Sequence, residues 1–341
     1  MRNRPATIKD IARKLRISTS TVSRAFRNLP DVNPDTKRLV LEMAKKLEYE
    51  PNAIATSLVN KKSNILGIVI PSFVIYYYAS AITGIQNAAS EAGYNIMICP
   101  SNESYDMEVK NVKTLISSRV DGLIVSISKE TTNFDHFTQL LRRGTPLIFF
   151  NRVCDELEAP FVVVDDYKGA YNAVKHLITT GSKRIGHIAG PKTLQISKNR
   201  LNGYLDALIK YNYDTDEKLI TTGDFSIEMG RKCAKKMLDL PKPPDAIFAA
   251  NDLSAFGAMH EIKKRGLRIP EDVAVVGFTD EPLTELVEPS LTSVSQPVME
   301  LGKKAAQLIL AQIENKANQD NPERVMLKTK LIVRNSSVKR M

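Results

Sequence analysis

Eight short apolar runs, separated by helical stretches, follow Asn64, and this alternation constrains the fold more than any other feature of the sequence. Strands that are apolar along their whole length are typical of parallel sheets covered by helices on both faces. There are more strand–helix units than one sheet comfortably holds, so we predict an α/β core of two doubly wound parallel-sheet lobes. The runs are NILGIVIP, NIMICPS, VDGLIVSIS, TPLIFFNR, PFVVVDD, RIGHIAG, DAIFAAND and VAVVGF.

The two lobes are expected to exchange segments of chain. The run LTSVSQP at 291–297 has no evident place in the second sheet, so we predict that it returns the chain to the first lobe. The helix VMELGKKAAQLILAQIE then packs on the first lobe, and RVMLKTKLIVR goes back to the second. Two such lobes form a cleft at the carboxyl ends of their strands, where ligands bind. The predicted lobes comprise residues 64–163 plus 296–323, and residues 164–295 plus 324–341.

Most of the positive charge lies in the first 62 residues. They contain seven Lys and seven Arg against three Asp and three Glu, whereas the whole chain of 341 residues has a formal net charge of +10. A basic head on a nearly neutral body indicates a polyanionic partner for the head. From charge alone, a solvated basic tail remains an equal alternative.

Three short helices are predicted in the head, residues 1–50. Thr7 can cap the first helix, with Asp10 placed to bond back to it, and Ser18 can cap the second. Asn33 followed by Pro34 is typical of a third helix start. Apolar residues at helical spacing form the expected inward faces: Ile8, Ile11, Ala12, Leu15; Val22, Ala25, Phe26; and Val40, Met43, Ala44, Leu47.

The second helix, in the stretch STSTVSRAF, presents Thr19, Ser20, Ser23 and Arg24 outward. Hydroxyl side chains compete with the backbone for hydrogen bonds, so helix interiors normally avoid them. Two helices joined by a tight turn and braced by a third are helix-turn-helix anatomy, in which such groups contact phosphates and base edges. A three-helix bundle with an ordinary polar surface fits the same spacing.

Residues 51–63 form a predicted hinge helix and linker. PNAIATSLVN is too short for a stable isolated helix in water. It is either a plain connection between domains or a segment that folds only when a partner buries Leu58.

The segments ATIKDIARKLRISTSTVSRAF and PDVNPDTKRLVLEMAKKLEYEPNAIATSL resemble the DNA-binding head and hinge of the lactose-repressor (LacI/GalR) family. The resemblance implies that Thr19, Ser20 and Arg24 contact bases, that Thr21 and Ser23 contact the DNA backbone, and that Leu58 wedges into the minor groove. Arg16 departs from the family, which usually has glycine in this turn. The predicted DNA-binding set also includes Thr7, Asn28, Asn52 and Ala55.

The rest of the chain resembles the periplasmic-binding-protein-like core of the same family, through motifs such as VDGLIV, RIGHIAGP, RLNGY and AAND. The positions that match the family's effector contacts are Tyr77, Tyr78, Ser126, Asn151, Arg200, Phe225, Asn251, Thr279, Asp280 and Gln296. Each has a plainer alternative: the tyrosines as a lobe-edge pair, Arg200 as a solvated helix residue, Asn251 as a helix cap and Phe225 as core.

Two of these positions bear on the ligand. Thr279 and Asn151 stand where relatives often carry aspartates, so the cavity lacks two charge-assisted acceptors. We therefore expect either a ligand whose acidic group pairs with Arg200 or one with fewer hydroxyl groups.

The sequence lacks the phosphate-binding motifs G-x-G-x-x-G and G-x-x-x-x-G-K-[ST] and the nucleophile elbow G-x-S-x-G, so an enzyme is not expected. Its four histidines form no ligand cluster and its three cysteines no disulfide or zinc pattern, so neither cofactor nor metal is predicted. No apolar run is long enough to span a membrane, and no export signal follows Met1.

The prediction is a cytoplasmic transcription regulator, most simply a repressor, that binds pseudo-palindromic operator DNA under the control of a sugar-like effector. It is expected to be a homodimer rather than a tetramer, because no leucine heptad that could build a helical bundle follows LIVRNSSVKRM. The alternative is an α/β enzyme or a solute-binding protein with a basic N-terminal appendage.

Overall fold

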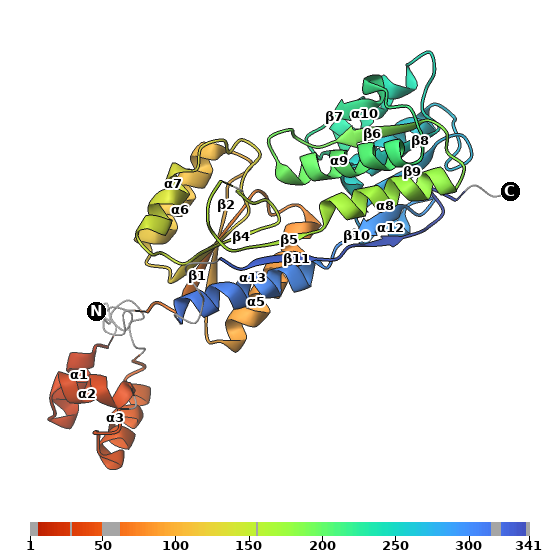
Figure 1. Cartoon of the computed structure of the whole chain (residues 1–341). Coiled ribbons are helices and arrows are strands. Elements are labelled where there is room, and N and C mark those ends of the chain that lie inside the picture. Colours follow the sequence, from red (N-terminus) through yellow and green to blue (C-terminus); the bar gives the residue numbers. More distant parts are fainter. Residues whose placement is uncertain (1–5, 28, 50–61, 155, 315–321, 339–341) are drawn as a thin grey trace. The chain divides into compact units, whose positions relative to one another are not determined.

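The structure is a computed structural model that describes residues 6–27, 29–49, 62–154, 156–314 and 322–338 (Figure 1). The chain divides into two units, a head at residues 1–63 and a core at residues 64–341.

The head contains three helices whose starts agree with the sequence signals. The Asp10 carboxylate accepts hydrogen bonds from the backbone N–H of Thr7 at 3.0 Å and from its hydroxyl at 2.7 Å. Ser18 accepts from the backbone N–H of Thr21 at 3.0 Å, and Asn33 accepts from that of Asp35 at 2.8 Å. All the apolar residues predicted to face inward join one cluster. The helices are α1 (Ile8–Leu15), α2 (Thr19–Phe26) and α3 (Pro34–Lys46).

Arg16 occupies the turn between α1 and α2 in the left-handed conformation, with φ 55° and ψ 39°. A non-glycine residue tolerates this region at a modest energetic cost. The next backbone N–H, from Ile17, donates to the carbonyl of Ala12 at 3.1 Å, which closes the end of the helix. Arginine therefore takes the left-handed backbone conformation that glycine would favour.

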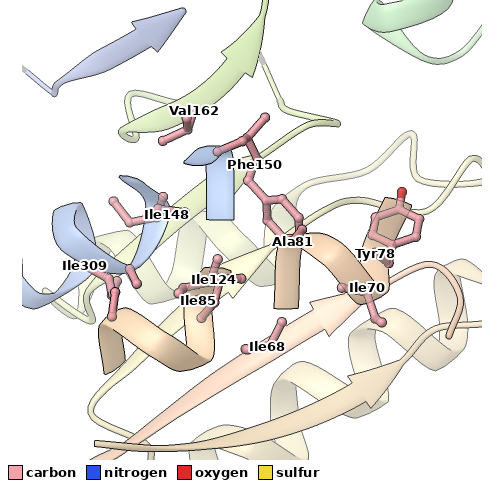
Figure 2. Close-up of a cluster of buried hydrophobic side chains, with 14 of the residues drawn as sticks. Ile68, Ile70, Tyr78, Ala81, Ile85, Ile124, Ile148, Phe150, Val162 and Ile309 are labelled. Carbon is pink, nitrogen blue, oxygen red and sulfur yellow. The ribbon is translucent and has the colours of Figure 1, made fainter. Parts of the chain in front are cut away.

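The first lobe of the core is built on a six-stranded, wholly parallel sheet in the order β11-β5-β4-β3-β1-β2. The helices α5 and α13 cover one face, where Figure 2 shows a cluster that includes Ile68, Ile124 and Phe150. The helices α6 and α7 cover the other face. The elements are β1 (Ile65–Ile70), α5 (Tyr76–Glu91), β2 (Asn95–Pro100), α6 (Tyr105–Ser117), β3 (Gly122–Val125), α7 (Asp135–Arg142), β4 (Leu147–Phe150), β5 (Phe161–Val164), α13 (Val298–Ile313) and β11 (Arg324–Leu327).

The close packing of α13 on α5 depends on glycine. A Cβ at Gly84 would collide with the backbone carbonyl of Met299, and a Cβ at Gly302 would collide with that of Ala81. Two glycines, one in each helix, therefore allow the backbones to touch. This contact fixes the predicted return of residues 298–313 to the first lobe.

The second lobe has a six-stranded sheet in the order β12-β10-β9-β8-β6-β7, in which β12 alone is antiparallel to its neighbour. The helices α8 and α9 cover one face and α10 and α11 the other. The elements are α8 (Asp166–Thr179), β6 (Ile185–Ala189), α9 (Gln195–Lys210), η1 (Glu217–Leu219), β7 (Ile220–Thr222), α10 (Ile227–Leu238), β8 (Ala246–Ala249), α11 (Asp252–Lys264), β9 (Ala274–Thr279), α12 (Leu283–Leu286), β10 (Thr292–Ser295) and β12 (Lys330–Ile332).

Two predictions about the exchanged segments were wrong. The run at 291–297 was expected to return the chain to the first lobe, yet residues 292–295 form β10, which pairs with β9 in the second sheet and lies within the predicted range 164–295 of that lobe. Residues 324–341 were assigned to the second lobe, but β11 pairs with β5 in the first sheet and only β12 belongs to the second. The run RVMLKTKLIVR is thus divided at Lys328–Thr329, because its two halves each complete the edge of a different sheet.

Candidate nucleic-acid interface and ligand cavity

The outward side of α2 carries the predicted DNA-contacting residues. Thr19, Ser20 and Arg24 are exposed, and Thr21 and Ser23 are half-buried. The Ser18 hydroxyl lies 2.7 Å from that of Ser20 and 2.8 Å from that of Thr21, so the first turn presents a linked group of hydroxyls. Such groups act as both donors and acceptors, as contacts to phosphates and base edges require.

Arg24 forms an ion pair with Asp31, and the two side chains are 47% and 44% exposed. An exposed pair of this kind adds only about 0–1 kcal/mol to stability. Arg24 can therefore exchange Asp31 for another acceptor at little cost.

The remaining predicted DNA-contacting residues divide into two groups. Thr7 is engaged with Asp10 at the start of α1. Asn28, Asn52, Ala55 and Leu58 lie outside the described residues, as does most of the hinge predicted at 51–63.

A cavity of about 50 Å³ lies between the lobes of the core, where loops from the carboxyl ends of strands of both sheets meet. This is where doubly wound sheets bind ligands. Of the ten predicted effector residues, eight line it. The lining comprises Ile75, Tyr77, Tyr78, Asn151, Arg152, Ile196, Arg200, Phe225, Asn251, Thr279, Glu281 and Gln296.

Arg200 is a buried residue of α9 and not a solvated one, at 3% exposure. Its guanidinium donates to the Asp166 carboxylate at 2.8 and 2.6 Å and to the carbonyl of Ala250 at 2.5 Å. The Phe278 ring lies under it, 3.9 Å from centroid to guanidinium carbon. Burial raises the pKa of Asp166 although Arg200 opposes that shift. The charge of Arg200 is thus already balanced within the protein.

Arg152, which the sequence analysis missed, is the second cation of the lining. Its guanidinium donates to Glu103 at 2.8 Å and lies 5.8 Å from the centroid of the Phe225 ring, which belongs to the other lobe. Glu103 also accepts from the backbone N–H of Lys129, whose carbonyl accepts from the Thr193 hydroxyl of the second lobe at 2.7 Å. Arg152 and Lys129 therefore connect the cavity to the contacts between the lobes.

The predicted tyrosines form one wall and pack edge to face, with ring centroids 5.4 Å apart. The Tyr78 hydroxyl lies 3.3 Å from that of Ser126 and accepts from the Asn151 amide at 3.3 Å. Ser126 therefore sits behind Tyr78 and does not line the cavity. The Tyr77 hydroxyl is buried and has no partner among the described residues.

Asn251 and Phe225 each combine a structural role with a place in the lining. Asn251 caps α11 by accepting from the backbone N–H of Ser254, and its amide donates to the carbonyl of Phe225 at 2.9 Å. Phe225 packs in a small apolar cluster with Leu194 and Ile196. At both positions the plainer alternative holds, and the residue also lines the cavity.

Four non-glycine residues at or beside this site adopt a strained backbone conformation. Asn151, Phe225, Thr279 and Asp280 have φ values of 60°, 71°, 131° and 65°, in a region that non-glycine residues rarely adopt. Such strain costs about 1–3 kcal/mol per residue and is typical of functional sites held in place by surrounding structure.

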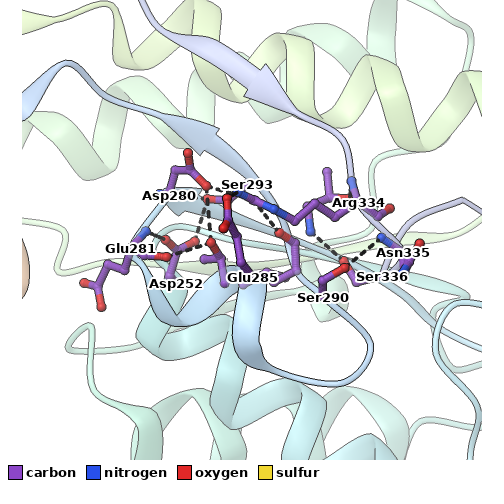
Figure 3. Close-up of polar contacts among 12 residues, drawn as sticks. Asp252, Asp280, Glu281, Glu285, Ser290, Ser293, Arg334, Asn335 and Ser336 are labelled. Atoms are coloured by element: carbon purple, nitrogen blue, oxygen red, sulfur yellow. Dashed lines mark hydrogen bonds and ion pairs between the residues drawn. The ribbon is translucent and has the colours of Figure 1, made fainter.

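Asp280 does not line the cavity. Its carboxylate accepts from Arg334 at 2.8 Å and from the Thr284 hydroxyl at 3.2 Å (Figure 3). Thr279 and Gln296 do line it, and the Gln296 amide donates to the Thr279 hydroxyl at 3.1 Å.

Glu281, also missed from the sequence, brings a carboxylate to the lining. Its backbone N–H donates to Asp252 at 2.9 Å, and Asp252 also accepts from the Ser293 hydroxyl at 2.6 Å. Burial, with the neighbouring Asp252, raises the pKa of Glu281 to about 7, and burial raises that of Asp252 to about 6. The sequence places the acidic residue Glu281 two positions after Thr279, but no sequence pattern shows that this residue is buried.

Two histidines of the second lobe, His176 and His187, have structural partners. The His187 ring stacks between Tyr204 and Phe248, and its Nδ1 lies 2.9 Å from the carbonyl of Phe248. Burial lowers the pKa of His187 to about 4. His176 Nε2 lies 2.7 Å from the Ser337 hydroxyl.

Among the described residues, no three His, Cys, Asp or Glu side chains converge in a way that would hold a metal ion. Within the same residues, no helix is long and apolar enough to cross a membrane.

Two family profiles together span nearly the whole chain. Residues 7–52 match "Bacterial regulatory proteins, lacI family", and residues 63–335 match "Periplasmic binding proteins and sugar binding domain of LacI family".

Similar proteins agree with these profiles. The HTH-type transcriptional repressor CytR of Escherichia coli K12 is 34% identical over 91% of this chain and 90% of its own. Catabolite control protein A of Priestia megaterium is 32% identical over 89% of this chain and 91% of its own.

Among solved structures, the lac repressor dimer bound to operator and the anti-inducer ONPF has a TM-score of 0.88 at 25% identity, over 98% of this chain and 100% of its own. The complex of the transcriptional regulator CelR with cellobiose has a TM-score of 0.75 at 30% identity, over 97% and 99%. With its helix-turn-helix head and its two-lobed core, the chain belongs to the lacI family of DNA-binding transcriptional regulators.

Proposed function

We propose that this regulator is a cytoplasmic repressor that binds a pseudo-palindromic operator as a homodimer, and that a sugar-like effector in the cavity controls its operator affinity. The observation that carries the proposal is the cavity itself, which lies at the strand ends of both lobes in a chain that also has a helix-turn-helix head. The dimer and operator of the lac repressor structure, and the cellobiose of the CelR structure, support the assignment by similarity.

The DNA-contacting part of the proposal assigns base contacts to Thr19, Ser20 and Arg24, and backbone contacts to Thr21 and Ser23. Arg24 supplies parallel donors that match guanine in the major groove. Phosphate contacts by the basic head would supply much of the affinity and make it fall steeply with salt.

The effector part of the proposal requires the lobes to move. The cavity of about 50 Å³ is well below the roughly 300–1,000 Å³ of typical ligand sites. Entry of a sugar ring would therefore separate contacts that join the lobes, such as Thr193 to the Lys129 carbonyl and Arg152 to Phe225. The resulting change of lobe angle would alter operator affinity through the hinge, with a coupling of about 1–3 kcal/mol, or roughly 5- to 150-fold.

Operator selection tests the proposal. The full chain is used to enrich duplexes from a random pool, and the affinity for the enriched sequence is measured by fluorescence anisotropy at several salt concentrations. A symmetric consensus with a steep salt slope is expected. A chain that enriches no sequence would contradict the proposal.

A further inference from the structure

Glu281 is a buried residue whose carboxylate faces the cavity and has no partner among the residues that the structure describes. It lines the cavity and is only 6% exposed. No hydrogen bond or ion pair joins its carboxylate to another residue in the described part of the chain. Figure 3 shows its backbone bonded to Asp252 while its side chain extends away from that network.

The cations of the cavity do not neutralise Glu281. Arg200 is paired with Asp166, and Arg152 is paired with Glu103. Each arginine therefore already has its own carboxylate, and Glu281 is one negative group in excess. A buried charge without a partner is costly, so the site favours a ligand that supplies the missing positive charge.

A second acceptor lies at the same edge of the cavity. The Gln296 Oε1 atom is buried with no hydrogen-bond partner among the described residues, while its amide nitrogen donates to Thr279. Gln296 and Glu281 both line the cavity, and both follow strands of the second sheet that pair with each other. The cavity therefore offers acceptors to a group rich in donors.

We propose that Glu281 selects effectors that carry a protonated amine, and that the effector is an amino sugar, a hydroxylated ring with one primary ammonium group. An ammonium has three N–H donors and no acceptor, so it suits a cavity edge that offers the Glu281 carboxylate and carries a second acceptor on Gln296. The inference rests on the proposed function, because it takes this cavity as the effector site. It replaces the expectation of an acidic ligand, since Arg200 is already paired.

The pKa of Glu281, raised to about 7, agrees with this assignment. A bound ammonium would stabilise the charged carboxylate, so binding should strengthen as pH rises toward about 7 and weaken again where the amine of the ligand loses its proton. Of the neighbouring groups, Asp252 loses its proton near pH 6, and the paired arginines stay charged throughout.

The test is a matched ligand series measured by calorimetry on the full chain. For glucose, galactose and mannose, the neutral sugar is compared with its 2-amino, 6-amino, N-acetylated and uronic acid forms. We expect an amino form of at least one series to bind about tenfold or more tightly than its neutral parent. The N-acetylated form, which is larger but uncharged, should lose that advantage.

Two variants assign the preference to Glu281. In Glu281→Gln the advantage of the amino form should fall to about parity. Glu288→Gln makes the same chemical change on an exposed loop residue that does not line the cavity, and it should keep the preference. An equal loss in both variants would contradict the assignment.

The outcomes separate this inference from the proposed function. If a neutral or acidic sugar binds as tightly as any amine and changes operator affinity, the amine inference is wrong and the proposed function stands. If no series binds, the amino-sugar class is wrong too, and operator selection alone decides whether the chain is a repressor.

Discussion

Two arginine–aspartate pairs illustrate how the head and the core differ. In the head, Arg24 and Asp31 are each nearly half exposed, whereas in the core Arg200 and Asp166 are 4% and 3% exposed. The exposed pair is screened by water and contributes little. The buried pair is fixed by a further carbonyl and an aromatic ring. An exposed arginine can exchange its partner for DNA, while a buried one shapes a cavity and stays in place.

The largest effect is expected when the buried pair of Arg200 and Asp166 is broken. Arg200→Ala leaves the Asp166 carboxylate buried and unpaired, so the unfolding free energy of the core should fall by about 3–5 kcal/mol. Urea denaturation followed by circular dichroism measures it. Arg24→Ala is the matched control and should leave the core transition within about 0.5 kcal/mol. A loss below about 1 kcal/mol for Arg200→Ala would mean that the two pairs do not differ as described.

The second prediction concerns pH and Glu281. The pKa of Glu281 is raised from 4.5 to about 7, so this group contributes most stability below pH 4.5 and loses that contribution as pH rises through 7. Glu281→Gln cannot ionise, so its stability relative to the natural protein should increase over this range by up to about 3 kcal/mol. Urea denaturation of both proteins across this pH range measures the stability difference, and Glu288→Gln serves as the control. A difference that does not change with pH would contradict the burial of the carboxylate.

The third prediction concerns the contribution of the exposed Arg24 to DNA recognition. Arg24→Ala should cost about 1–3 kcal/mol of binding to the selected operator while changing binding to random duplex much less. Anisotropy titrations with both duplexes measure the two affinities. Asp31→Asn frees Arg24 instead and should not weaken operator binding. Unchanged discrimination in Arg24→Ala would remove this residue from the base-contacting set.

The smallest effect concerns the start of α2. Ser18→Ala removes the acceptor for the Thr21 backbone N–H and should lower the stability of the head by about 1 kcal/mol. Ser20→Ala removes a neighbouring hydroxyl that accepts no backbone hydrogen bond from any described residue, so it should lower the stability of the head only by a few tenths of a kcal/mol. Thermal unfolding of the two variants, followed by helical circular dichroism, compares them. Equal losses would contradict the cap.

The head could be predicted closely because its signals are local. Thr7, Ser18 and Asn33 begin helices within a few residues of the groups that they bond. The strands near the crossings between the lobes were harder to predict. The strand β10 is a short, polar stretch, and one continuous run supplies both β11 and β12.

Prediction of the cavity lining from the sequence was limited in the same way. Most of its predicted members were found by resemblance, and the structure brings them together. Arg152 and Glu281 were missed because their sequence neighbours do not reveal burial, which depends on contacts with distant segments. The paired state of Arg200 also depends on Asp166, thirty-four positions away.

In the proposed mechanism, a ligand in the core changes how tightly the head binds DNA. The most direct measurement is the affinity of the full chain for its selected operator and for random duplex, with and without saturating ligand from the sugar series. We predict a preference for the operator of about 10³-fold or more, and a roughly 5- to 150-fold change in operator affinity with ligand. Equal affinity for both duplexes, with or without any ligand, would contradict the account.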